Sequence, residues 1–145
     1  MKNIIYLFAI ALLFSCEKEQ VISDTPIIEF KSISPTTVQE YSDDIIIITI
    51  TYSDGNGDLG QNDPDIHNLF VEDNRNGIVY QFRIPHLAPD NNSIAIEGDF
   101  NITINGSGIT DTSLSSQQVK YNIYVTDRAG NNSNTITTST ITIQQ

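Results

Sequence analysis

Apolar and polar residues alternate along most of the chain after Pro26, and no segment there repeats apolar residues at the helical period of about 3.6 residues. Clusters of Asn, Asp and Gly interrupt the alternation, as turns between strands do. The pattern predicts strands over seven segments: residues 27–33, 45–52, 68–72, 78–84, 94–104, 119–125 and 135–143.

The same alternation predicts which side chains face the interior. Segment 45–52 is apolar or β-branched at consecutive positions, as in a strand that is buried centrally. In segment 135–143, Ile136 is out of phase with the later isoleucines, which predicts a bulge or an edge position. Segment 119–125 has four apolar side chains on one face, which is predicted to point inward: Val119, Tyr121, Ile123 and Val125.

These strands predict the fold class. Seven short strands within about 120 residues, with no pair of cysteines to join the layers, are typical of an immunoglobulin-like sandwich. The prediction is therefore an all-β fold, a single immunoglobulin-like β-sandwich of about seven strands over residues 26–145. The chain shows no internal repeat and no second domain.

The composition excludes several classes of function. The chain has 145 residues, with 18 Asp and Glu against 7 Lys and Arg and a formal net charge of −11. This excess of acid argues against binding to a nucleic-acid backbone, which requires clustered Lys and Arg. With one cysteine and two histidines, an intramolecular disulfide and a thiolate metal cluster are excluded, and a histidine-rich metal site is not expected.

The N-terminus carries the pattern of an export signal. Lys2 supplies a short positive start, and an unbroken apolar run extends from Ile4 to Phe14. This run is shorter than the roughly 20 residues that a membrane-spanning helix needs. It matches the apolar region of a secretory signal peptide.

The end of this run resembles the lipobox of bacterial lipoproteins. It reads Leu13-Phe14-Ser15-Cys16, with Leu three residues before the Cys and a small residue directly before it. The resemblance implies lipid transfer to the Cys16 thiol, cleavage after Ser15, acylation of the new terminus by a palmitate-type chain and anchorage in a membrane. The alternative is an ordinary secreted protein whose only Cys stands at the cleavage site by chance.

Residues 1–15 are thus predicted as a lipoprotein signal peptide, and residues 16–25 as the lipidated Cys with a short polar tether. The segment Glu17-Lys18-Glu19-Gln20 resembles the export signal of surface lipoproteins in the Bacteroidota. The resemblance implies a lipid-anchored outer-membrane protein on the cell surface, with the periplasmic face as the alternative.

A polar loop after segment 45–52 has the composition of a cation site. Calcium takes about six to eight oxygen ligands, and side chains at alternate positions of a curved backbone can converge on one point. Three glycines in this loop permit the tight or left-handed turns that such wrapping needs. The candidate ligands are the side chains of Asp54, Asn56, Asp58, Asp63 and Asp65, and Asn62 could act directly or through water.

The loop resembles the Asp-x-Asn-x-Asp calcium loops of EF-hands and related repeats. It departs from the EF-hand pattern in having Leu59 where Gly is expected, Asp65 rather than Glu at the end, and no flanking helices. By the same resemblance, the carbonyl of Gly60 is a further candidate ligand. The alternative is that the Asp-Gly-Asn-Gly-Asp stretch is simply turn chemistry between strands.

The sandwich topology brings other residues to the same pole. The loop after segment 119–125 begins at Asp127, and either Asp127 or Asn131 could complete a calcium shell. A salt bridge from Arg128 to an acid of the first loop is the alternative. The loop 85–92, with Asp90, returns to this pole. Strand 27–33 starts there too, which predicts that the ion site lies beside the tether.

No catalytic residues are predicted. His67 and His86 are isolated, and the serines between residues 107 and 116 have no His or Lys partner that would activate a nucleophile. Among the strand tyrosines, Tyr124 points outward and is the candidate for stacking on a ligand.

Two functions are therefore carried forward. The first is a membrane-anchored, non-enzymatic lipoprotein, stabilised by calcium, that acts as a surface accessory, adhesion or binding module for a glycan or protein partner. The whole chain resembles small Bacteroidota lipoproteins of this kind. The second is a small calcium-assisted hydrolase or glycan-processing enzyme.

Overall fold

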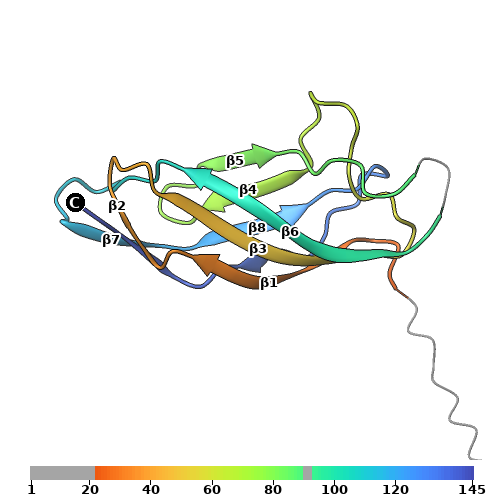
Figure 1. The fold of residues 1–145 in the computed structure, drawn as a ribbon, viewed down its shortest axis with the longest axis horizontal. Helices are drawn as coiled ribbons and strands as arrows, with labels where there is room; N and C mark the ends of the chain where they lie inside the picture. The colour runs from red at the N-terminus through yellow and green to blue at the C-terminus, as the bar shows by residue number, and fades with distance from the viewer. Residues whose placement is uncertain (1–21, 90–92) are drawn as a thin grey trace, which may run out of the picture.

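A computed structural model describes residues 22–89 and 93–145. The signal segment, Cys16 and most of the tether lie outside these residues, as does Asp90. The described residues form strands and loops and contain no helix, so the predicted all-β fold is confirmed (Figure 1). Accordingly, no helix in the described part of the chain could cross a membrane.

The strands of the described residues follow the alternation of the sequence closely. They are β1 (Ile27–Ser34), β2 (Thr37–Gln39), β3 (Ile45–Asp54), β4 (Leu69–Asp73), β5 (Val79–Phe82), β6 (Ile96–Asn105), β7 (Ser116–Val119), β8 (Tyr121–Val125), β9 (Ile136–Thr137) and β10 (Ile141–Gln144).

These strands build two facing layers. One layer is the sheet β1-β3-β6, and the other contains the sheet β5-β4-β8-β9. A smaller sheet, β2-β10-β7, continues the second layer, because only Lys120 separates β7 from β8. All pairs are antiparallel except β2 with β10. The arrangement is a β-sandwich with a loop cluster at each end.

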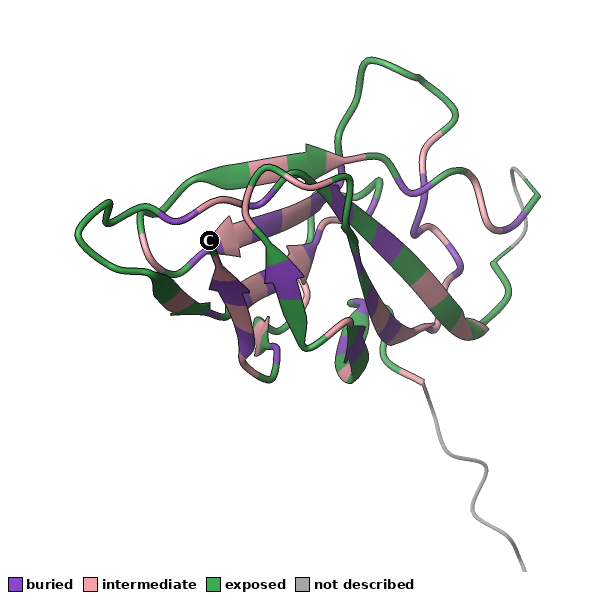
Figure 2. Ribbon diagram, turned by 60° about the vertical axis from the view of Figure 1, so that its left-hand side comes forward, coloured by how far each residue is buried: buried purple, intermediate pink, exposed green. Residues whose placement is uncertain are grey.

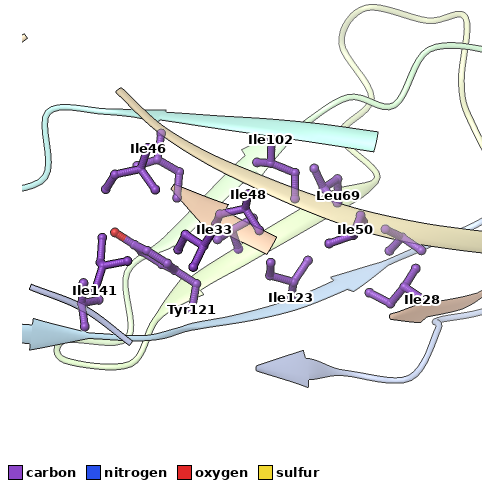
Figure 3. Packing of buried hydrophobic residues seen from close by; sticks show 14 of the residues in the cluster. Ile28, Ile33, Ile46, Ile48, Ile50, Leu69, Ile102, Tyr121, Ile123 and Ile141 are labelled. Atoms are coloured by element: carbon purple, nitrogen blue, oxygen red, sulfur yellow. The ribbon is translucent and has the colours of Figure 1, made fainter. Parts of the chain in front are cut away.

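Isoleucine side chains fill the space between the layers. Figure 3 shows Ile46, Ile48 and Ile50 of β3 facing Tyr121 and Ile123 of β8, and these five side chains are at most 1% exposed. Burying each such side chain stabilises the fold by about 1.5–3 kcal/mol. The predicted inward face of segment 119–125 is confirmed, since Val119 and Val125 are buried as well.

The structure corrects the prediction for segment 45–52. Ile45 and Ile47 are 50% and 44% exposed, whereas Ile46, Ile48 and Ile50 are buried. The layer β1-β3-β6 covers the core with one face only, so β3 is central in its sheet without being buried on both sides. Figure 2 shows this alternation of buried and exposed residues along the strands.

Three further differences concern short strands. The predicted strand 119–125 is two strands, because β7 ends at Val119 and pairs with β10, whereas β8 begins at Tyr121 and pairs with β4. β2 was not predicted, because three residues are too few to display a period, and it forms only by pairing with β10. The predicted last strand, 135–143, is two strands: β9 pairs with β8 at the edge of one sheet, and β10 pairs with β7 and β2. The break between β9 and β10 accounts for the phase change at Ile136.

Two neighbouring isoleucines of β3 test the assignment of the faces. Replacing buried Ile48 by Ala should lower the free energy of unfolding by about 2–5 kcal/mol, because it leaves a cavity in the core. The Ile47→Ala change on the solvent face should cost less than about 1 kcal/mol. Urea unfolding of residues 21–145 measures both. Equal losses for the two variants would contradict the assignment.

Candidate metal centre

The Asp-rich loop begins where β3 ends, and it is fastened to the core. The Asp54 side chain is 0% exposed, and its Oδ2 accepts a hydrogen bond of 2.7 Å from the backbone N–H of Leu59. The Leu59 side chain is itself fully buried in the hydrophobic core. The leucine that departs from the EF-hand pattern therefore anchors the loop.

Glycine is required at two points of this loop. Gly57 and Gly60 have φ angles of +70° and +100°, in the left-handed region that side chains disfavour. A Cβ at Gly57 would also overlap the carbonyl oxygen of Ile94, and one at Gly60 would overlap that of Pro85. The loop is thus packed against Pro85 and Ile94, and it is more than an exposed turn.

Two carboxylate oxygens in this loop are buried without a hydrogen-bond partner in the described part of the chain. They are Oδ1 of Asp54 and Oδ1 of Asp58. Burial raises the pKa of Asp54, and the negative charge of Asp127 raises it further; together they outweigh the lowering effect of the backbone N–H groups of Leu59, Asn56 and Asp58. Burial also raises the pKa of Asp58, with added contributions from the charges of Asp127 and Asp54. The charge of Asp127 thus disfavours ionisation of both Asp54 and Asp58, and the charge of Asp54 adds to this effect at Asp58.

Arg128 closes the loop without forming an ion pair with it. Its Nη1 donates to the carbonyl oxygen of Gly60 at 3.0 Å and its Nη2 to that of Gly57 at 3.4 Å. Its backbone N–H donates to the carbonyl of Asp58 at 3.2 Å. The ion pairs among the described residues are Lys31–Asp99 and Arg75–Asp73. The guanidinium charge lowers the pKa of Asp58, but burial and the neighbouring carboxylates outweigh it.

Asp127 and Asn131 form one unit beside this loop. Asp127 is 6% exposed, and its Oδ1 and Oδ2 accept hydrogen bonds of 2.7 and 2.9 Å from the backbone and side-chain N–H groups of Asn131. Within the loop, Oδ1 of Asn56 accepts from the backbone N–H of Asp58 at 3.2 Å. The predicted meeting of the two loops at one pole is therefore observed.

Asp63 and Asp65 lie elsewhere. Both are exposed, in the loop 61–67 that projects beyond the sheets in Figure 1, and Oδ1 of Asp63 accepts from the backbone N–H of Asp65 at 3.0 Å. Among residues 22–89 and 93–145, no group of three or more His, Cys, Asp or Glu side chains is placed to hold a metal ion. Of the predicted carboxylate ligands, Asp54 and Asp58 lie near Asp127, whose charge acts on both of them.

The described residues that precede β1 lie at this pole. Ile27, the first residue of β1, pairs with Ser53 directly before Asp54. The backbone N–H of Gly55 donates to the carbonyl oxygen of Ser23 at 2.7 Å. The last residues before the sandwich are thus bonded to the candidate cation loop.

The remaining candidates have local partners. The Tyr124 ring stacks on Phe70, with centroids 4.8 Å apart and an interplanar angle of 14°, so Phe70 covers one of its faces. Nδ1 of His86 lies 3.0 Å from the side-chain nitrogen of Asn62. The buried ion pair of Arg75 with Asp73 was not predicted, because the sequence Asp-Asn-Arg-Asn-Gly is typical of a surface turn.

Comparison with known proteins adds no further assignment. No protein-family model, curated protein or solved structure matches the chain.

The pKa shift of Asp54 predicts how the metal-free protein responds to pH. Because the folded protein holds this proton more tightly than the unfolded chain, the free energy of unfolding falls as pH rises above the ordinary pKa of 3.8. In chelator at neutral pH, Asp54→Asn should therefore unfold at a higher temperature than the natural protein. The amide oxygen still accepts from the Leu59 N–H. Near pH 3.8 the difference should shrink.

The matched control is Asp63→Asn, which neutralises an exposed carboxylate of the same region and should leave the transition nearly unchanged. A lower melting temperature for Asp54→Asn across the whole pH range would contradict the assigned repulsion.

Proposed function

We propose that this protein is a lipid-anchored, non-enzymatic β-sandwich of the bacterial outer membrane, stabilised by calcium and acting as a surface accessory, adhesion or binding module. One observation carries the calcium proposal. Oδ1 of Asp54 is buried without a hydrogen-bond partner in the described residues, beside the equally unpartnered Oδ1 of Asp58. A buried carboxylate is costly unless a cation or donors compensate it.

Calcium suits this group of oxygens. It is a hard cation that binds carboxylate, amide, carbonyl and water oxygens in flexible geometry. The Oδ1 atoms of Asp54 and Asp58 would be its direct ligands, with Asp127 adding a third negative charge next to them. Asn56 and water would supply further oxygens. Gly60 is a weaker candidate, because its carbonyl already accepts from Arg128.

The position of the site suggests its role. Gly55 lies between Asp54 and Asn56 and bonds to Ser23 of the tether base. A cation that orders residues 54–58 would therefore also hold the point where the tether joins the sandwich. Calcium would then set how the domain stands on its lipid anchor.

The anchor itself is proposed from the N-terminal sequence. The apolar run and Leu13-Phe14-Ser15-Cys16 match the pattern of a lipoprotein signal, and Cys16 is the one cysteine of the chain. Acyl chains bind a bilayer durably when two or more are present, since each buried methylene contributes about 0.8 kcal/mol.

Calcium should raise the stability of residues 21–145. At one hundred times the dissociation constant, the gain is about 2.7 kcal/mol, or several degrees in melting temperature at this size. The shift between calcium and chelator should disappear in Asp58→Ala and persist in Asp65→Ala, whose carboxylate lies in the projecting loop. Identical melting curves with and without calcium would reject the cation site.

The tether should respond to the same ion. Hydrogen exchange at the Gly55 amide, which donates to Ser23, should slow in calcium because residues 54–58 open less often. The Thr142 amide, which donates to Thr36 at the other pole, is the internal reference. A stabilising calcium effect with unchanged relative exchange at Gly55 would separate the ion site from the tether and refute this role.

A further inference from the structure

Tyr41 is held in an unfavourable conformation at the pole opposite to the tether. It lies in the turn between β2 and β3, near the end labelled C in Figure 1. Its φ angle is +58°, and it is the one residue other than glycine with a positive φ in the described part of the chain. For a bulky side chain this backbone conformation is a rare outlier.

Burial of the Tyr41 side chain does not offset the energetic cost of this backbone conformation. The Tyr41 side chain is 92% exposed, so it buries almost no apolar surface. An Asn or Gly would suit this backbone better, and any polar residue would suit this exposure better. The stability of the sandwich therefore gives no reason for an aromatic ring at this position.

The ring stands beside a hollow of about 300 Å³ lined by Glu40, Tyr41, Ile109, Thr112 and Gln145. The lining combines one aromatic and one apolar side chain with carboxylate, hydroxyl and amide groups. This mixture, at the small end of the usual size range, is typical of a site for a compact polar ligand.

The wall of this hollow is built into the fold. Oε1 of Glu40 accepts from the backbone N–H of Ile109 at 2.9 Å. Nη1 of Arg75 donates to the carbonyl of Gly108 at 2.8 Å, and this guanidinium is fixed by its buried ion pair with Asp73. The segment 108–110 is thus held in place before any ligand arrives, which lowers the entropic cost of binding.

We propose that this hollow, the Tyr41 site, binds one neutral sugar ring of a glycan. The apolar C–H face of a pyranose would stack on the Tyr41 ring, and its hydroxyls would donate to Glu40 and exchange hydrogen bonds with Thr112 and Gln145. This inference names the ligand class of the proposed binding module, and it rests on that proposed role. It does not depend on the cation loop at the other pole.

Charge favours a neutral ligand over an acidic one. No Lys or Arg is among the described residues that line the hollow. Asp44 and Asp111 lie close by in the chain. Hydrogen bonds from the Gln39 backbone and from the Ser113 hydroxyl, respectively, lower their pKa values and keep them ionised. Since the hollow presents hydroxyl and amide groups as well as Glu40, it fits a sugar better than a simple cation.

The test is direct binding to the whole protein, held in a detergent without sugar groups. The probes are neutral hexasaccharides of glucose, mannose, xylose and N-acetylglucosamine. Calorimetry and saturation-transfer NMR measure their binding. At least one should bind, and Tyr41→Ala should weaken it by about tenfold or more, as truncation of an anchoring aromatic does. Tyr41→Phe should retain most of the affinity, and Glu40→Gln should lose part of it.

Tyr41→Gly separates binding from stability. Glycine relieves the left-handed backbone, so this variant should melt at a higher temperature and yet lose the sugar. Ile47→Ala, an exposed residue of β3 that does not line the hollow, is the control and should bind normally.

Binding to none of the four sugars, or binding that survives Tyr41→Ala, would overturn the proposal. So would preferential, salt-sensitive binding of heptalysine at this site, which would indicate a basic peptide ligand. The calcium shift in melting temperature, measured on the same samples, reports on the proposed cation site independently.

Discussion

The packing of β3 against the opposite layer is the constraint on which the rest of the structure depends. Ile46, Ile48 and Ile50 are buried between the sheets, and their strand pairs with both β1 and β6 along its length. Because this packing holds β3 in register, its two ends are held at opposite poles of the sandwich. One end delivers Asp54 to the tether pole, and the other is preceded by the turn that carries Tyr41.

The buried carboxylates at the two poles differ in their partners. Asp73 is fully buried, but Arg75 lies against it at 2.6 Å and also donates to backbone and side-chain oxygens of the loop after β6. Asp54 is equally buried, yet one of its oxygens has no partner among the described residues and the nearest charges include two carboxylates. The carboxylate of Asp73 is neutralised by an arginine of the same chain, whereas that of Asp54 forms no ion pair among the described residues.

Part of the arrangement of the Asp-rich loop could be predicted from the sequence, because its signals are local. The alternate Asp-Asn-Asp spacing and the glycines occur within a few residues, and antiparallel topology placed Asp127 at the same pole. The separation of Asp63 and Asp65 from the other carboxylates could not be predicted, since nothing in the local sequence shows that residues 61–67 project from the sheets. The function of Leu59 as a core anchor and the capture of the Gly60 carbonyl by Arg128 both depend on contacts between distant segments.

The sequence by itself determined the all-β class, most strands and the inward face of β8, because strand periodicity records burial residue by residue. Tertiary structure alone decided that β3 exposes one face, that β2 forms, and that the last strand divides between two sheets, since each depends on which neighbours are present. It also decided which carboxylates approach one another. Tyr41 is distinguished by its positive φ angle and its high exposure, and the sequence of the turn predicts neither of them. Such features arise from packing between segments far apart along the chain, where local pattern carries no information.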